Sequence, residues 1–329
     1  WYLPRRPLGA GAPLGKASQG DALFVAPNPA FGATFTYHLA QGYKTAKELR
    51  ADALKETGDG EAPAPPSFDE FRRESKEEPP SVVLTITDAA GSVVTRIHGP
   101  ASKGIHRVTW NLRRPDTSAW QRSAVEDEWN DGSDRGALCP PGDYTVHFGT
   151  LRSGQYADLG IQRPFRVVPL GGGSLPGATP EESAAFQVEI AEVSRVMSAT
   201  SAKLADALER VGAIRSVLRR TPALPAQLGT EARDLENRLK ELQRRVDGDD
   251  LLENANEAGP MSLGSRMAIA SMGTAYSTYG PTPNHLKALD IVSRGLEAVR
   301  QELLIIESSD IARLNAALDG ARAPWTPGR

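Results

Sequence analysis

The sequence predicts an α+β protein with more than one domain, in which an antiparallel β-sandwich precedes an antiparallel bundle of three to four helices. Apolar and polar residues alternate in short runs between residues 81 and 170, whereas apolar residues after 181 recur at steps of three, four and seven. A glycine-rich connection, 171–179, separates the two patterns. The length of 329 residues suffices for two or three modest domains.

Residues 1–43 are predicted to be an extended N-terminal segment that contains one strand. The segment is rich in glycine and proline, and its single strand-like run, 32–39, combines aromatic and β-branched residues. A short strand left alone has an unpaired edge and exposed aromatic side chains. We therefore expect this run to complete a sheet or to cover a face elsewhere.

Residues 44–80 are predicted to be a charged, proline-rich linker. Seventeen of these 37 residues are charged and five are proline. Such a stretch buries too little apolar surface to offset the entropy that it loses on ordering. One short exposed helix is expected from Lys44 to Glu56, and the remainder is expected to be a linker or a long excursion.

Residues 81–170 carry the alternation that predicts the β-sandwich. The segment from Asp88 to Gly91 supplies a hairpin-type turn between the first two strands. Trp110 lies on the same face of its strand as Val108 and Leu112, so we expect its side chain to lie in the core. The expected strands are 82–87, 93–97, 106–112, 143–148 and 164–168, and a long acidic loop, 113–137, separates the third from the fourth.

Residues 171–329 are predicted to form the helical bundle. The first helix is expected from Glu181 to Arg219, after a start signal at Thr179 that continues with proline and two glutamates. Thr282 followed by proline marks the start of the last long helix. Apolar stripes with polar opposite faces are typical of helices packed in a bundle. Two further helices are expected between these two, over 228–246 and 266–274.

Five aromatic residues are the candidate partner-binding residues: Trp1, Phe31, Tyr37, Trp120 and Trp129. The first three belong to the N-terminal segment, and the last two lie in the acidic loop. Aromatic anchors in a polar frame are typical of protein interfaces. We therefore expect the N-terminal segment and the acidic loop to belong to one interface.

The composition of the acidic loop is compatible with binding of a small ligand and also with a solvent-exposed loop that binds nothing. Carboxylates beside tryptophan are suited to a sugar or to calcium, but an EF-hand loop that starts at Asp127 fails because its third position is Trp129. A solvated excursion whose tryptophans pack on a neighbouring domain accounts for the same residues.

The residue types that usually carry chemistry form no recognisable motif here, so we predict no catalytic residue, cofactor or metal. The five histidines lack the i, i+4 spacing of a helical metal site, and Cys139, the single cysteine, has no local histidine. With 38 basic and 41 acidic residues, the net charge of −3 argues against nucleic-acid binding. No apolar run approaches the roughly 18 residues of a transmembrane helix.

The sandwich region resembles the immunoglobulin-like domain of flagellar hook-capping proteins, a repeat also found in many exported bacterial proteins. The residues that carry the resemblance are Leu84-Thr85-Ile86-Thr87-Asp88, Gly91, Val94, Ile97, Gly104-Ile105-His106-Arg107-Val108-Thr109-Trp110-Asn111 and Pro141-Gly142-Asp143-Tyr144-Thr145-Val146. The resemblance implies an immunoglobulin-like adaptor fold without any chemistry of its own. This chain departs from the pattern where the long acidic loop replaces a short connection.

Over its whole length the chain resembles the C-terminal region of bacterial proteins with a sortilin-like or sialidase-like β-propeller, which are often labelled glycosyl hydrolases. The run 24–37, the charged linker, the sandwich and the helical tail carry this resemblance. It implies an exported protein, secreted or located in the periplasm or cell envelope. The Asp-box hairpins of the propeller do not occur here, so no activity transfers to a residue of this chain.

Three functions remain open from the sequence. The first is a non-catalytic accessory region that docks on, caps or oligomerises a β-propeller domain or chain. The second is a glycosidase-related module that contributes to a carbohydrate site, which the loop tryptophans favour. The third is a free-standing structural or assembly protein of the cell envelope. The chain starts at Trp1 without a signal peptide, and we expect a mature form, a proteolytic product or a piece of a longer protein.

Overall fold

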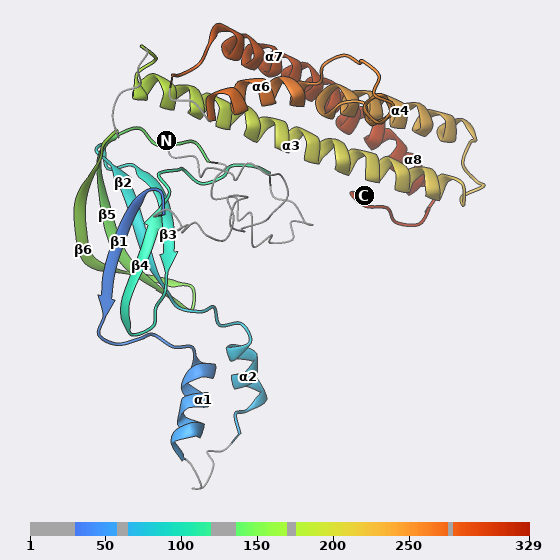
Figure 1. Ribbon diagram of the computed structural model, residues 1–329. Coiled ribbons are helices and arrows are strands. Elements are labelled where there is room, and N and C mark those ends of the chain that lie inside the picture. The colour runs from blue at the N-terminus through green and yellow to red at the C-terminus, as the bar shows by residue number, and fades with distance from the viewer. Residues whose placement is uncertain (1–29, 58–64, 120–135, 170–175, 276–278) are drawn as a thin grey trace, which may run out of the picture. The chain divides into compact units, whose positions relative to one another are not determined.

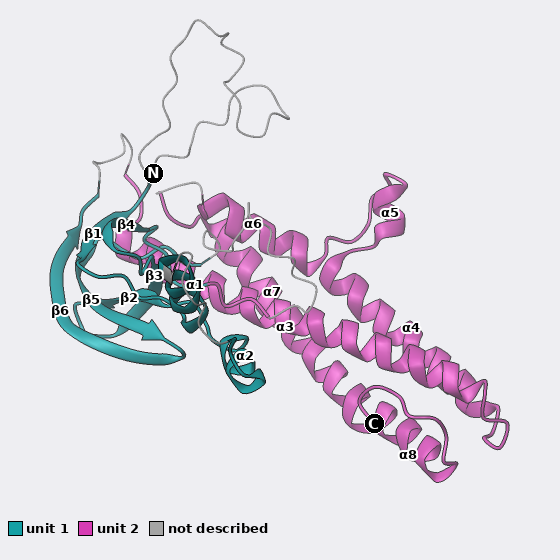
Figure 2. Cartoon of the chain, turned by 90° about the horizontal axis from the view of Figure 1, so that it is seen from below, with its two compact units in different colours: residues 1–115, 133–172 teal, residues 116–132, 173–329 magenta. Residues whose placement is uncertain are grey.

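The computed structural model describes residues 30–57, 65–119, 136–169, 176–275 and 279–329. The protein is α+β: two antiparallel sheets in a sandwich-like arrangement are followed by a region of packed helices (Figure 1). The chain forms two compact units, 1–115 with 133–172 and 116–132 with 173–329, which Figure 2 shows in different colours. The expected order of sheets before helices is confirmed.

The larger sheet has the strand order β3-β2-β5-β6 and is antiparallel throughout. The Asp88 to Gly91 turn is confirmed, because the Asp88 carboxylate accepts hydrogen bonds from the amides of Ala90 and Ser92 at 3.0 and 2.9 Å. The strands are β2 (Ser81–Asp88), β3 (Val93–Gly99), β5 (Gly142–Arg152) and β6 (Gln155–Val167).

The last strand is longer than the sequence predicts. Alternation indicates a strand over 164–168 only, but β6 begins at Gln155. Ser153 and Gly154 form a two-residue turn in which both residues have positive φ, 48° and 74°, as type I′ hairpins require. This turn carries the chain directly from β5 into β6, and pairing with β5 holds a segment that lacks an apolar alternation of its own.

The smaller sheet pairs β1 (Ala33–Leu39) with β4 (Gly104–Trp110) in antiparallel register. The expectation that the N-terminal run completes a sheet is therefore confirmed. Trp110 is 1% exposed, as its parity predicts, and its ring makes edge contacts with Tyr144 and Phe165 at 5.4 and 6.2 Å. Side chains of both sheets meet in one core, whose buried members are Val82, Leu84, Ile86, Val94, Trp110, Cys139, Tyr144, Val146 and Phe148.

The charged segment between β1 and β2 holds two helices. The predicted helix is confirmed as α1 (Ala46–Thr57), but α2 (Phe68–Glu74) lies where a linker was expected. Ser67 and Glu70 form a reciprocal capping box at the start of α2. Arg50 of α1 bonds the Glu74 carboxylate of α2 through two nitrogens, at 2.9 and 2.7 Å. Capping and a bidentate ion pair thus order α2, in which no residue is buried.

The helical unit is built on α3 (Pro180–Leu218), a helix of 39 residues whose capping box at Thr179 and Glu182 confirms the predicted start. The helices predicted over 228–246 and 266–274 are confirmed as α4 (Gln227–Asp247) and α6 (Leu263–Ala275). A short helix, α5 (Asp250–Asn254), follows α4, and α7 (Pro283–Ile305) starts at Thr282 as predicted.

Two apolar clusters hold the helical unit together. One joins α3 and α4 to the C-terminal helices, and the other joins the first half of α3 to α6 and α7. Fully buried side chains at the centre of the first cluster include Leu204, Ile214, Leu239, Leu242 and Leu314.

The last long helix is interrupted by a π-helical turn, η1 (Ile306–Ile311), before α8 (Ala312–Gly320). Ile306 and Ile311 are both 0% exposed although they lie five positions apart in the sequence. In a regular α-helix a step of five turns the side chain roughly 140° away from the first one. The wider π turn absorbs one additional residue, so that both isoleucines face the same core.

Candidate interaction site on the β-sandwich

The structure describes two of the five candidate partner-binding residues. Trp1, Trp120 and Trp129 lie outside the described residues. Phe31 lies just before β1 and is 42% exposed, and Tyr37 lies within β1 and is half-buried. The candidate interaction site is therefore the sandwich surface at β1.

Tyr37 is part of the sandwich rather than a freely exposed anchor. Its hydroxyl donates a hydrogen bond to the Pro100 carbonyl at 2.6 Å, and its ring lies 5.4 Å from His106 and 6.2 Å from Phe148. Burial raises the pKa of this phenol above its ordinary value, so it remains a neutral donor at physiological pH. The hydroxyl also passes close to Gly99, where a Cβ would lie 2.5 Å from it.

The core-facing residues of β1 are incompletely covered. Phe35, Tyr37 and Leu39 point toward the core and pack against it, yet each remains only half-buried. The sheet that carries them has two strands, so within the described part of the chain the outer edge of β1 has no neighbouring strand. An open edge beside partly exposed apolar side chains is a surface that can receive a partner.

Gly32 fixes where β1 begins. It has φ of +127°, and a Cβ at this position would lie 1.9 Å from the Trp110 carbonyl oxygen. Only glycine combines this backbone conformation with such a close approach. The glycine thus permits β1 to start in register with the end of β4.

We expect Gly32→Ala to destabilise the sandwich by about 1–3 kcal/mol, because alanine adds backbone strain and a steric clash with the Trp110 carbonyl. Hydrogen exchange should show faster exchange of the β1 and β4 amides. Gly91→Ala is the control. Gly91 also has a positive φ, but a Cβ there would contact nothing within 4 Å, so this variant adds backbone strain without a steric clash. Equal exchange of β1 amides in both variants would show that the clash has no role.

The base of the acidic loop is held by backbone contacts that sequence patterns do not predict. Arg113 and Leu138 form an antiparallel bridge, and the Trp110 indole donates to the Arg113 carbonyl at 2.8 Å. At the described start of the loop, the Ala119 amide donates to Ser198 Oγ of α3 at 2.9 Å. The two ends of the acidic loop are therefore held next to each other where they join the sandwich.

Cys139 has an environment that opposes nucleophilic chemistry. The thiol is 4% exposed, and burial raises its pKa to about 11. Only the thiolate is an effective nucleophile or metal ligand, and this thiol is protonated at neutral pH. The neighbouring Tyr144 donates its hydroxyl to the Pro140 carbonyl at 2.7 Å, and burial raises its pKa to about 12. Both groups act as core residues.

The histidines are dispersed. His106 Nε2 donates to the Ser102 carbonyl at 2.7 Å, so this ring is a hydrogen-bonded residue of the sandwich. His147 lies on the opposite face of β5 from Tyr144, because an odd number of positions separates them along the strand. Among the described residues, no group of three or more His, Cys, Asp or Glu side chains is arranged to hold a metal ion.

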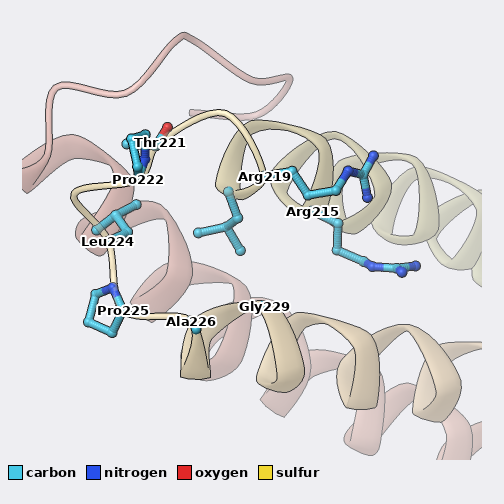
Figure 3. Close-up of a pocket in the computed structure, with 9 residues that line it drawn as sticks. Arg215, Arg219, Thr221, Pro222, Leu224, Pro225, Ala226 and Gly229 are labelled. Atoms are coloured by element: carbon cyan, nitrogen blue, oxygen red, sulfur yellow. The ribbon is translucent and has the colours of Figure 1, made fainter.

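A hollow of about 500 Å³ lies where α3 turns into α4 (Figure 3). Its cationic groups are engaged: Arg215 forms an ion pair with Glu236, and Arg219 contacts the Ser216 hydroxyl at 3.5 Å. Thr221 donates back to the Val217 carbonyl at 3.0 Å. These contacts close the connection between the two helices and present no organised set of free polar groups.

No helix in the described residues is both long enough and apolar enough to cross a membrane. Comparison of the chain with protein-family models, with curated proteins and with solved structures finds no match.

Proposed function

We propose that this chain is a non-catalytic accessory region, formed by an immunoglobulin-like sandwich and an antiparallel bundle of three to four helices. In this proposal it docks on, or oligomerises, the β-propeller of an exported protein in the periplasm, the cell envelope or the medium. The observation that carries the proposal is the outer edge of β1, which has no neighbouring strand among the described residues and lies beside the half-buried Phe35, Tyr37 and Leu39. The family resemblance supplies the identity of the partner.

The chemistry of β1 supports docking. Its outward side chains, Thr34, Thr36 and His38, include neither lysine nor proline, whereas edge strands that must avoid pairing usually carry lysine, proline or a bulge. A partner strand or loop beside β1 would satisfy the backbone groups that no described strand pairs with, and would cover the apolar side chains behind them. Such an addition to a sheet edge is a common mode of protein recognition.

A carbohydrate site is the second candidate function. It rests on Trp120 and Trp129 with their surrounding carboxylates, in the loop whose ends are fixed at Arg113 and Leu138. The third candidate function is a free-standing envelope protein. Like the accessory region it has no catalytic role, and it differs from that region only in lacking the propeller partner.

The first test is the reading frame upstream of the Trp1 codon. A propeller encoded in frame would allow the two parts to be produced separately and mixed. We expect analytical ultracentrifugation to detect their association, and Thr36→Lys on β1 to weaken it at least tenfold, because a charge at the edge opposes pairing. Ala90→Lys, in the exposed turn before β3, is the matched control and should leave association unchanged.

Three results would contradict specific parts of the proposal. Equal association of both lysine variants would exclude β1 as the docking edge. A reading frame without a propeller would favour the free-standing protein. Loss of association after replacement of Trp120 and Trp129 by alanine, with Thr36→Lys having no effect, would place the interface on the acidic loop.

A further inference from the structure

The outer face of the larger sheet, opposite to the face that packs on β1 and β4, carries a groove of about 720 Å³. All four strands contribute to it. Its lining is polar at the centre and includes two histidines, an arginine, an aspartate and a tyrosine. Among the lining residues are Thr85, Arg96, His98, His147, Tyr156 and Asp158.

Three hydrogen-bond donors stand side by side across the groove. Arg96 of β3 lies opposite Thr85 of β2, and Thr85 lies opposite His147 of β5. Directly opposed residues of antiparallel strands have Cβ atoms about 4.5–5.5 Å apart, so the arginine and the histidine both flank the threonine. A guanidinium, a hydroxyl and an imidazole therefore converge on the space above Thr85.

Both groove histidines are oriented by a neighbouring hydroxyl. His98 Nδ1 lies 2.9 Å from Ser81 Oγ, and His147 Nε2 lies 3.3 Å from Thr87 Oγ1. Each ring thus uses one nitrogen within the sheet and leaves the other to the groove. Among the described residues, Arg96 has no carboxylate within ion-pair distance. Its charge is available to a ligand.

An aromatic ring lies beside these donors. A Cβ on Gly149 would fall 2.4 to 2.5 Å from the ring atoms of Tyr156, so the ring covers the sheet where residue 149 has no side chain. The other side of this ring is accessible, because Tyr156 is 51% exposed. The glycine and the tyrosine together form a flat apolar platform next to the donor row.

The charges of the groove are arranged asymmetrically. Arg96 and His98 come from β3 at one side, His147 comes from β5, and β2 contributes no titratable group. Asp158 lies on β6 at the other side, where its carboxylate accepts the Gly160 amide at 2.8 Å. An anion bound above Thr85 would have cationic or donor groups as its nearest neighbours, with the aspartate two strands away from Thr85.

We propose that this groove binds a small organic anion. A phosphate or carboxylate group would accept hydrogen bonds from Arg96, Thr85 and His147, and a ring or other apolar body of the ligand would pack on Tyr156. A guanidinium recognises planar or tetrahedral oxyanions through paired N–H donors. The site is independent of docking at β1, because it lies on the opposite face of the larger sheet.

The proposal is tested by isothermal titration calorimetry of the full chain with four probes: phenyl phosphate, benzoate, inorganic phosphate and phenol. We expect an aryl anion to bind more tightly than either inorganic phosphate or phenol, because it uses both the donor row and the platform. The stronger of phenyl phosphate and benzoate identifies the preferred oxyanion. Failure of both aryl anions to bind at millimolar concentration overturns the proposal.

Four variants locate the site. Arg96→Gln should weaken aryl-anion binding at least tenfold, whereas Arg107→Gln, on the outward face of β4, should not change it. Tyr156→Ala should reduce the affinity for the aryl anion to that for inorganic phosphate, and Tyr156→Phe should preserve it. Equal losses in Arg96→Gln and Arg107→Gln would show nonspecific attraction to surface charge and overturn the proposal.

Folding of the variants is checked in the same samples. Amide chemical shifts away from the groove should match those of the parent chain, and aryl-anion titration of the parent should move the amides of Thr85 and Gly149. Shifts confined to other surfaces would overturn the assignment of the groove even if binding is measured.

Discussion

Replacement of Trp110 by alanine is expected to lower the free energy of unfolding of the sandwich by about 3–5 kcal/mol. The indole is 1% exposed, contacts Tyr144 and Phe165 and donates a hydrogen bond to the Arg113 carbonyl at 2.8 Å. Alanine would leave a cavity at the centre of the core and would remove the indole's hydrogen bond to the Arg113 carbonyl. Both effects reduce stability.

The measurement is denaturant-dependent hydrogen exchange in the β2 and β5 amides, which report on the sandwich alone. Ile105→Ala on β4 is the matched control, because this side chain belongs to the sandwich, is 74% exposed and should change stability by less than about 1 kcal/mol. A loss below about 1 kcal/mol for Trp110→Ala would contradict the core position of the indole.

Replacement of Ile311 by alanine is expected to cost the helical unit about 2–5 kcal/mol. Ile311 is 0% exposed at the end of the π turn and belongs to the larger helical core. Ile305→Ala is the control, because this isoleucine is 58% exposed and a surface change of this kind stays within about 0.5 kcal/mol. Thermal unfolding followed by circular dichroism at the helical bands measures both.

Deletion of Ser309 tests the origin of the π turn. The deletion shortens the spacing between Ile306 and the second isoleucine from five residues to four, which a regular α-helix accommodates on one face. We expect the shortened chain to fold with a melting temperature close to that of the parent. A loss as large as that of Ile311→Ala would mean that the π geometry itself, rather than the burial of the isoleucines, stabilises this helix end.

The strand at the candidate interaction site could be predicted from local sequence, but the strand with which it pairs could not. The aromatic and β-branched run 32–39 identifies a strand, and its isolation in the sequence predicts that it pairs elsewhere. That β4 is its partner depends on residues about seventy positions away and on the fit of Gly32 against Trp110. The hydrogen bond from Tyr37 to Pro100 follows from that pairing and leaves no local signal.

The groove on the larger sheet was not detectable in the sequence. Arg96, Thr85 and His147 belong to three strands, and only the antiparallel register brings them into one row. The hairpin that places Tyr156 over Gly149 also depends on β6, whose first half lacks the alternation that identifies a strand. By contrast, the sequence does contain a sign of the π turn. The apolar residues of the last helix recur every three or four positions, and this spacing is broken by the step of five from Ile306 to Ile311.

The sequence by itself determined the order of sheets and helices, the core position of Trp110, and the helix starts at Thr179 and Thr282. These properties depend on alternation and capping between residues that are close along the chain. Only the tertiary structure decided which strand pairs with β1, that α2 is ordered by Arg50, and which polar side chains share a groove. Such features depend on contacts between distant segments, whose formation is set by the packing of the whole unit rather than by local residue preference.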